Sequence, residues 1–171
     1  MVDTRHATAE TDLGDMMLVA RGDRLIGCYF PGHWYPPAAD SIGTEVVGAE
    51  DDVLAEATMQ LRDYLAGGRR QFDIELQTAG DEFSERVWEL LRKIPYGDTT
   101  TYGELAEQLG GRSLAQRVGQ AVGHNPLSIF IPCHRVVGAD GSLTGFAGGL
   151  HRKRRLLELE EPVEVRSGRL F

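Results

Sequence analysis

The stretch TTYGELAEQLGGRSLAQRVGQAVG, residues 100–123, contains two short helical patterns separated by a pair of glycines. We expect one helix over residues 102–109, with Thr101 as its N-cap, and a second over residues 113–123. Two short helices joined by a glycine-containing turn have the spacing of a helix-turn-helix, whose second helix can enter a DNA groove. Many enzymes contain helix pairs of this kind, so the pattern alone does not decide the function.

A further amphipathic helix precedes this pair. Asp81 is placed to cap it, and the turn signal at residues 95–97 ends it. Residues 127–131, LSIFI, predict a buried, strand-like segment that follows the second helix of the pair. The apolar face of the preceding helix recurs at helical spacing and consists of Phe83, Val87, Leu90, Leu91 and Ile94.

Residues 11–79 have the pattern of a small α/β unit. The runs 16–20 and 25–30 predict a hairpin, residues 52–66 a helix, and the alternating run 72–78 another strand. Cys28 lies within the second run, where it is most simply a small hydrophobic residue of the sheet.

This division predicts two domains, residues 1–79 and residues 80–171. Residues 1–10 and 162–171 have no clear pattern, and we expect them to be tails.

The composition excludes several classes of protein. A chain of 171 residues with 42% hydrophobic residues suits one or two small globular domains. The 2 cysteines are too few for a disulfide framework, and without CxxC or HxxxH pairs we expect no metal site. No basic-then-apolar leader and no long apolar run occurs, so we expect a cytoplasmic protein without a membrane partner.

Charge is distributed unevenly along the chain. The net charge is −8, yet residues 1–85 carry −11 and residues 111–155 carry +6. The basic half suggests a surface that faces a polyanion. A solvated basic helix around HRKRR, residues 151–155, explains the excess about as well, and both interpretations stay open.

Residues 130–138, FIPCHRVVG, place Cys133 directly before His134 and behind Pro132. A thiol with an ordinary pKa of ~8.5 needs a base or a positive field to become a nucleophile, and His134 is the obvious base. Adjacent side chains of an extended chain point to opposite sides, so we expect a bridging water rather than a direct hydrogen bond.

Such a histidine also needs an acid that fixes its tautomer. The candidates lie at the end of the last predicted helix, namely Glu158, Glu160 and Glu161. The alternative for an isolated Cys-His pair is a packed thiol beside a hydrogen-bonded imidazole.

Glycines cluster after this pair, at Gly145, Gly148 and Gly149, with Phe146 among them. Such a loop lets the backbone approach a flat ligand, and Phe146 can stack on it. A nucleophile, a loop that admits a planar group, a helix pair and a basic flank together suggest a protein that acts on a base drawn out of DNA.

These stretches resemble the O6-alkylguanine-DNA alkyltransferases, also called methylated-DNA–protein-cysteine methyltransferases. The resemblance rests on FSERVWELLRKIPYGDTTTYGELAEQLG (83–110), VGQAVGHNP (118–126) and IPCHRVVGADGSLTGFAGGLHRKRRLLELE (131–160). It implies an α+β protein with a small N-terminal α/β, ribonuclease H-like domain and a mainly helical C-terminal domain with a helix-turn-helix. The first half matches only in size and in TDLGDMMLVA, residues 11–20.

The resemblance implies direct-reversal DNA repair without a cofactor. Cys133 would attack the alkyl carbon on O6 of an extruded guanine and keep the alkyl group permanently. His134 would deprotonate the thiol through a water, Glu160 would orient His134, and Tyr102 would donate to a ring nitrogen of the leaving guanine.

Further roles follow from the same resemblance. The carbonyls of Cys133 and Val136 would accept the exocyclic amine, and the Ala147 N–H would face O6. Asn125 would brace the turn before the active-site segment, and Lys153 would lie near the pocket. Phe146 stands where the family commonly has tyrosine, so stacking stays and a hydroxyl is lost.

The implied partner is double-stranded DNA that contains O6-alkylguanine, with cooperative self-association on that DNA. Gln116 stands where the family usually has an arginine that fills the gap left by the extruded base, and Arg117 follows it. Either Gln116 is a neutral plug, or the helix start shifts and re-aims Arg117. We expect weaker DNA binding than is usual in the family, with Arg117 on a phosphate. The expected DNA-binding residues are Ala115, Gln116, Arg117 and Arg135.

Three other functions are considered. A sensor of alkyl lesions would bind DNA without needing the thiol, and a helix-turn-helix regulator would not need the Pro-Cys-His-Arg segment. A cysteine hydrolase would need an oxyanion site and a base that is not adjacent in sequence.

Overall fold

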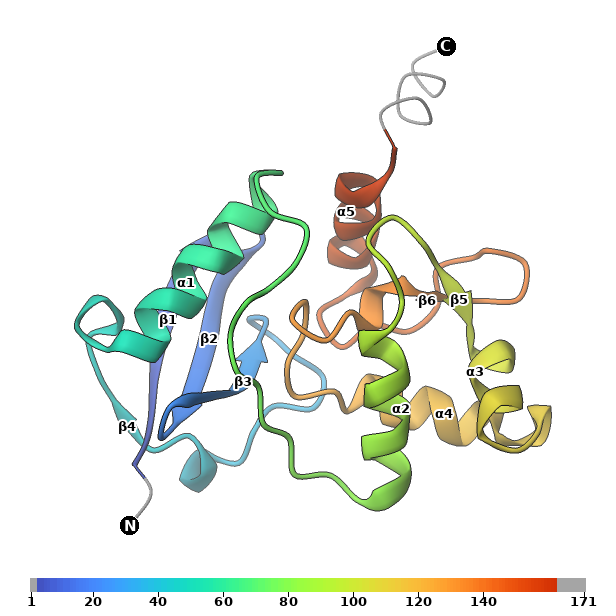
Figure 1. Cartoon of the computed structure of the whole chain (residues 1–171), viewed down its shortest axis with the longest axis horizontal. Helices are drawn as coiled ribbons and strands as arrows, with labels where there is room; N and C mark the ends of the chain where they lie inside the picture. Colours follow the sequence, from blue (N-terminus) through green and yellow to red (C-terminus); the bar gives the residue numbers. More distant parts are fainter. Residues whose placement is uncertain (1–2, 163–171) are drawn as a thin grey trace.

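The first half of the chain forms a four-stranded sheet with one helix across it. The structure, a computed structural model, describes residues 3–162. Strands β1 (Thr4–Thr11), β2 (Gly14–Arg21) and β3 (Arg24–Tyr29) are antiparallel, and β4 (Thr44–Glu45) pairs in parallel with β1. The order is therefore β3-β2-β1-β4, and Figure 1 shows helix α1 lying across these strands. The predicted hairpin is confirmed as β2 and β3.

Helix α1 (Asp52–Leu65) begins at its N-cap Asp51, whose carboxylate accepts the backbone N–H groups of Val53 and Leu54. Such a cap satisfies two donors that otherwise lack partners at a helix start. The same carboxylate receives Arg5 of β1, with 2.6 Å between Nε and Oδ2. The helix is thus fixed to the sheet at the position that the sequence predicts.

The expectation that residues 1–10 are a tail is wrong, because residues 4–11 form β1. Every second residue of this strand is buried, namely Arg5, Ala7 and Ala9. Two alanines and a paired arginine give only a weak alternation of hydrophobicity, although they are what fits beneath α1. The expected tail 162–171 lies outside the described residues except for Pro162.

The expected strand at residues 72–78 is also wrong. This run meets the sheet only through an isolated bridge at Leu76, which flanks Leu25 of β3. Cys28 in β3 is buried, as expected, and its N–H donates to the Pro126 carbonyl at 2.8 Å. Residues 126–128 of the second half therefore hydrogen-bond to the outer edge of β3 at Cys28.

The second half is mainly helical. It contains α2 (Glu82–Arg92), α3 (Tyr102–Leu109), α4 (Ala115–Gly123) and α5 (Leu150–Glu160). Short strands β5 (Thr100–Thr101) and β6 (Val136–Val137) pair in parallel. Four 3-10 turns complete the described chain: Ala39–Ser41, Gly48–Glu50, Arg112–Leu114 and Cys133–Arg135. The whole is a mixed α+β fold with five α-helices in the described residues.

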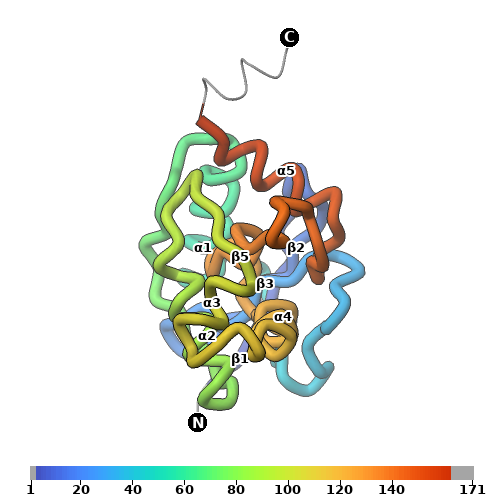
Figure 2. Tube along the Cα trace, turned by 90° about the vertical axis from the view of Figure 1, so that its right-hand side faces the viewer, coloured from blue at the N-terminus to red at the C-terminus, as the bar shows by residue number. Residues whose placement is uncertain are grey.

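Helices α3 and α4 form the predicted pair, and Figure 2 shows them side by side at the end of the molecule that faces the viewer. Thr101 caps α3 by accepting the Glu104 N–H at 3.1 Å. Gly110 takes a φ of 141°, which a residue with a side chain rarely adopts, and so ends α3. The second helix begins at Ala115 rather than at residue 113, because the turn Arg112–Leu114 comes first.

Three cations of the basic run 151–155 make structural contacts. Arg152 Nε donates to the Leu13 carbonyl at 2.7 Å, and Arg155 Nη1 donates to the Asp12 carbonyl at 3.0 Å. Lys153 is buried. Arg152 and Arg155 thus hold α5 to the β1–β2 turn, whereas Arg154 and the outer face of Arg155 are exposed, so a polyanion-facing surface stays a prediction.

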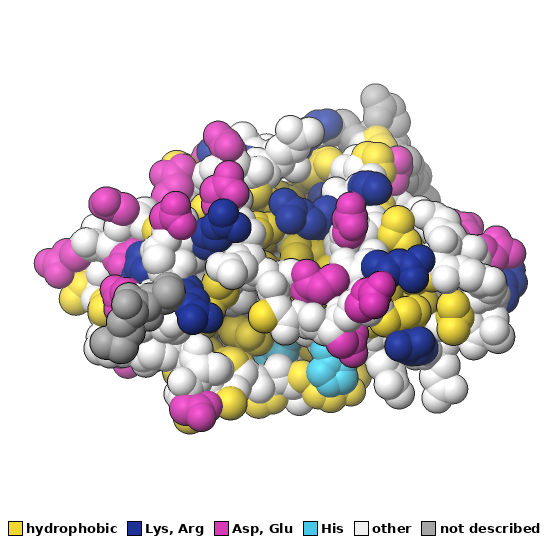
Figure 3. Space-filling view, turned by 60° about the horizontal axis from the view of Figure 1, so that its bottom comes forward, with side chains coloured by type: hydrophobic (Ala, Val, Ile, Leu, Met, Phe, Trp, Pro, Cys, Tyr) yellow, Lys and Arg dark blue, Asp and Glu magenta, His cyan; other side chains and the backbone are white. Residues whose placement is uncertain are grey.

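Surface charge is mixed on the face that Figure 3 shows. Acidic and basic side chains lie interspersed across it. Across residues 3–162, none of the helices has the length and apolar character needed to cross a membrane.

Candidate active site

Cys133 opens a 3-10 turn, Cys133–Arg135, that follows Pro132. Its side chain is buried, and its N–H donates to the Ile131 carbonyl at 2.7 Å. The segment before it is buried but is not a strand, which corrects the expectation for residues 127–131: the Ile131 N–H closes a turn onto the Leu127 carbonyl at 2.8 Å. Ile129 in this turn has a φ of 75°, a strained value for a β-branched residue.

Asn125 braces this turn. Its Nδ2 donates to the Ile131 carbonyl at 2.8 Å, and its Oδ1 accepts the Leu127 N–H at 2.9 Å. Both ends of the strained turn are thereby held by one buried side chain. Its amide also interacts with Cys133, and this hydrogen bond acts to lower the pKa of the thiol.

The Cys133 thiol is nevertheless a weak acid in this setting. Burial raises its pKa, and the opposing effects of Asn125 and of the Lys153 charge do not compensate. Burial likewise lowers the pKa of Lys153 to about 8, and its Nζ donates to the Thr144 carbonyl at 2.8 Å. A resting thiol beside a cation still needs a base to become a thiolate.

His134 is fully buried and is bound on one side only. Its Nε2 lies 2.8 Å from Glu160 Oε2, and its Nδ1 has no hydrogen-bond partner within residues 3–162. No direct hydrogen bond joins this ring to the thiol, because adjacent side chains of a 3-10 turn diverge. Burial lowers the pKa of His134, against the opposing effect of Glu160, so the imidazole is neutral at pH 7.

Glu160, the last residue of α5, is the acid of the three candidates that reaches this histidine. Burial alone would raise its pKa, but hydrogen bonds from His134 and Arg135 lower it to about 2. The carboxylate is therefore ionised, and it can only accept hydrogen bonds. It follows that His134 carries its proton on Nε2 and keeps a lone pair on Nδ1.

Arg135 is not available to DNA, which corrects that assignment. Its guanidinium is buried, and it donates through Nε to Glu160 Oε1 at 2.7 Å and through Nη2 to Oε2 at 2.8 Å. Its Nη1 donates to the Ile94 carbonyl at 2.6 Å. A bidentate pair of this kind positions the carboxylate rather than a partner molecule.

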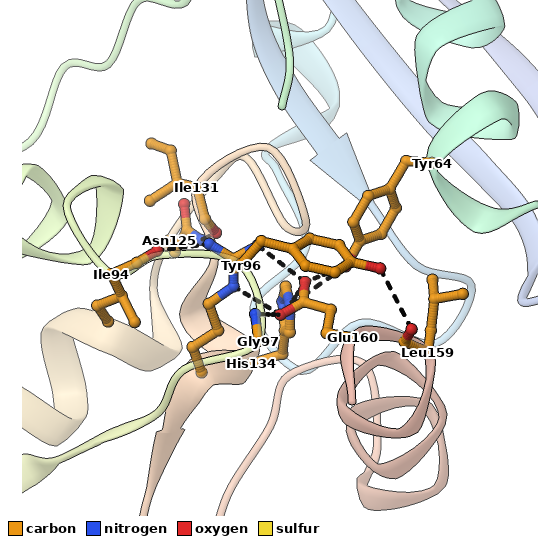
Figure 4. A network of polar contacts seen from close by, with 10 residues as sticks. Tyr64, Ile94, Tyr96, Gly97, Asn125, Ile131, His134, Leu159 and Glu160 are labelled. Atoms are coloured by element: carbon orange, nitrogen blue, oxygen red, sulfur yellow. Dashed lines mark hydrogen bonds and ion pairs between the residues drawn. The ribbon is translucent and has the colours of Figure 1, made fainter. Parts of the chain in front are cut away.

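Tyr64 of α1 completes this network, and no pattern in the sequence marks it as a site residue. Figure 4 shows its ring reaching toward Glu160 and His134, and its hydroxyl donates to Glu160 Oε2. The hydroxyl also lies 3.4 Å from His134 Nε2. Burial and the charge of Glu160 raise the pKa of Tyr64, so it remains a neutral donor. The first half of the chain thus contributes directly to the site.

A pocket of about 530 Å³ opens beside α4, and no Asp, Glu, Lys or Arg lines it. Its walls include five predicted site residues: Tyr102, Ala115, Gln116, Phe146 and Ala147. The Cys133 thiolate interacts electrostatically with Tyr102, so the sulfur lies near that wall. Trp34 and Tyr35 also line the pocket, and the sequence did not single them out.

Gln116 and Arg117 lie in different surroundings at the start of α4. Gln116 lines the pocket, whereas the guanidinium of Arg117 lies 4.0 Å from the centre of the Phe83 ring on α2. Arg117 is therefore not re-aimed toward the pocket.

Val136 lies in β6, beside Thr100 of β5. Its N–H donates to the Cys133 carbonyl, which retains a second lone pair. Within the described residues, no group of three His, Cys, Asp or Glu side chains could hold a metal ion.

The substitution Tyr64→Phe tests the network. Removing the hydroxyl leaves the charge of Glu160 less neutralised, which favours the imidazolium form of His134. We expect the pKa of His134 to rise by about half a unit or more, measured by NMR titration of its ring protons. Tyr29→Phe, which removes a hydroxyl from a ring packed on His33, serves as control. An unchanged pKa of His134 in Tyr64→Phe would show that this hydroxyl does not tune the site.

Comparison with known proteins places this site in a family. Residues 82–162 match the DNA binding domain of 6-O-methylguanine DNA methyltransferase. A methylated-DNA–protein-cysteine methyltransferase of Mycobacterium tuberculosis is 44% identical over 165 residues, covering 91% of this chain and 92% of the relative. The constitutive enzyme of that name from Bacillus subtilis is 38% identical over 144 residues, covering 84% and 86%.

A solved structure agrees with these relatives. The crystal structure of Mycobacterium tuberculosis OGT in complex with DNA superposes with a TM-score of 0.82 at 40% identity, covering 94% of this chain and 97% of that one. Sequence and fold both match over nearly the whole length, and the chain belongs to the methylated-DNA–protein-cysteine methyltransferase family.

Proposed function

We propose that Cys133 is the acceptor in a single-use repair reaction that removes the alkyl group from O6-alkylguanine in DNA. Family membership makes the chain a methylated-DNA–protein-cysteine methyltransferase that repairs DNA by direct reversal. The observation that carries the assignment to Cys133 is its position beside a neutral, oriented His134, a buried Lys153 and an uncharged pocket.

Activation of the thiol falls to His134. Because Glu160 holds the proton on Nε2, the lone pair on Nδ1 is free to take a proton, and a water molecule can pass it from the thiol. The Lys153 charge then stabilises the thiolate.

The transfer is a displacement at a saturated carbon. The sulfur forms a bond to the alkyl carbon while the carbon–O6 bond breaks, and its electron pair moves into the guanine. Tyr102, whose pKa burial raises, donates its hydroxyl proton to a ring nitrogen of the leaving base and regains a proton from His134 through solvent. The products are a thioether on Cys133 and restored guanine.

Recognition of guanine uses backbone groups around the same sulfur. We assign the second lone pair of the Cys133 carbonyl and the Val136 carbonyl to the exocyclic amine. The Ala147 N–H has no acceptor within residues 3–162 and is assigned to O6. Phe146, buried against Phe30 with 5.6 Å between ring centres, supplies the stacking face.

DNA binding is assigned to α3 and α4, as in the helix-turn-helix geometry that places the second helix in a groove. Ala115 and Gln116 lie where α4 meets the pocket, which suits a base extruded from the duplex. Arg117, exposed and resting on Phe83, remains our candidate for a phosphate contact.

Several finer assignments accompany this proposal. The order β3-β2-β1-β4 with a helix across it supports a ribonuclease H-like first domain, residues 1–79, followed by residues 80–171. The connection 66–81 between them contains no helix or named strand. We place the protein in the cytoplasm, and self-association on DNA stays a prediction.

The sensor and regulator alternatives leave the polar network unexplained. A protein that only binds a lesion needs neither an oriented base nor a cation beside a cysteine. The tight juxtaposition of these groups favours chemistry at Cys133.

Mass spectrometry tests the assignment. After incubation with a duplex that contains O6-methylguanine, we expect one methyl group on the peptide that contains Cys133. The Cys133→Ser variant is expected to transfer nothing measurable, while Cys28→Ser, which replaces the other cysteine, is expected to retain the transfer. Methylation at a different residue, or an unmodified Cys133, would overturn the assignment.

Gln116→Arg tests the gap-filling role. An arginine at this pocket position can both fill the space of an extruded base and attract phosphates, so we expect tighter duplex binding by about tenfold. Fluorescence anisotropy on the same duplex measures this affinity. Gln108→Arg serves as control, because it adds the same charge at an exposed position of α3 that does not line the pocket. Binding no tighter than that of the unaltered protein would count against this role.

A further inference from the structure

The loop after β3 presents two exposed aromatic rings. Trp34 is 60% exposed and Tyr35 is 45% exposed, which is unusual for side chains of this size. Both belong to the first half of the chain, yet both line the pocket beside α4. Figure 2 shows this light-blue loop passing beside α4.

This loop is fixed in place from beneath. The backbone N–H of Trp34 donates to the Ala147 carbonyl at 3.0 Å, which ties the loop to the segment that contains Phe146. The Tyr35 ring stacks on His124 just after α4, with 3.8 Å between ring centres and 21° between planes. The backbone of this loop is therefore fixed by its contacts, and it holds the Trp34 ring in an exposed position.

The surroundings of Trp34 select the kind of group that can cover it. The pocket has no charged side chain in its walls, so it offers no cation to a phosphate. It offers aromatic faces, and a flat, neutral nucleobase stacks well on such faces. A second copy of this chain or another protein could not sit here while DNA delivers a base to the same pocket.

We propose that Trp34, supported by Tyr35, stacks on a nucleobase that flanks the extruded nucleotide, so that the N-terminal half forms part of the DNA interface. This inference rests on the proposed function. Extruding one nucleotide removes the stacking partner of its neighbours, and the exposed indole replaces that partner. Trp34 and Tyr35 line the same pocket as residues of α4, the helix to which we assign the DNA contacts.

Three variants and two substrates separate this role from others. Trp34→Ala removes the ring, Trp34→Phe keeps a stacking face, and Val47→Ala is a matched control because Val47 is 62% exposed and lines no part of this pocket. The substrates are a duplex that contains O6-methylguanine and the free base O6-methylguanine at millimolar concentration. Binding is followed by anisotropy and transfer by the mass of the protein.

We expect Trp34→Ala to weaken binding of the methylated duplex by about tenfold or more, and Trp34→Phe to restore most of it. The rate with the free base should be unchanged in both variants, because a free base has no flanking neighbour. Val47→Ala should match the unaltered protein throughout. Trp34 fluorescence should also be quenched on duplex binding, a signal that is absent in Trp34→Phe.

Other results would overturn the inference. Unchanged duplex binding by Trp34→Ala would show that the ring does not touch DNA. An equal loss of rate with the free base would place Trp34 in the pocket for the lesion itself. Failure of the unaltered protein to accept a methyl group from either substrate would instead refute the proposed function on which the inference rests.

Discussion

The carboxylate of Glu160 joins side chains from both halves of the chain in one buried network. It is buried, and it accepts hydrogen bonds from His134, Arg135 and Tyr64. Burying a carboxylate without such partners costs several kcal/mol, about the size of a small domain's net stability. The partners come from α1 and from the turn that carries Cys133, so the ion is satisfied only when both dock against the end of α5. Folding and assembly of the site are therefore one event.

The same carboxylate sets the chemistry. Because it is ionised and accepts the Nε2 proton, it leaves His134 as a neutral base with its lone pair on the other nitrogen. Burial keeps the thiol of Cys133 protonated, and Lys153 nearby stabilises the charged form once the proton leaves. The single-use acceptor that we propose for Cys133 benefits from this arrangement, since an exposed thiolate would be consumed by other electrophiles.

Local patterns in the sequence were sufficient for the helices. The N-caps Asp81 and Thr101 and the glycines after α3 lie within a few residues of what they control, and the structure has them in place. Strand β1 was missed because its inward residues, Ala7 and Ala9, are small and Arg5 is charged. Its burial depends on α1, about fifty residues away in sequence.

Long-range contacts explain the remaining differences at the site. Glu158, Glu160 and Glu161 are equivalent in sequence, and only the resemblance singled out the middle one, which is the one that faces inward. Tyr64 lies 96 residues from its carboxylate partner, so no local signal marks it. Arg135 and Arg152 contribute to the basic excess of the second half of the sequence. Their charge alone does not reveal that Arg135 is buried in an ion pair and that Arg152 is held by carbonyl groups.

The tautomer of His134 can be measured by nitrogen-15 NMR of the imidazole in the unaltered protein at pH 7, which distinguishes a protonated ring nitrogen from a bare one. Because Nε2 faces the ionised Glu160, we expect a proton on Nε2 and none on Nδ1. A proton on Nδ1, or on both nitrogens, would mean that His134 cannot accept the proton of Cys133.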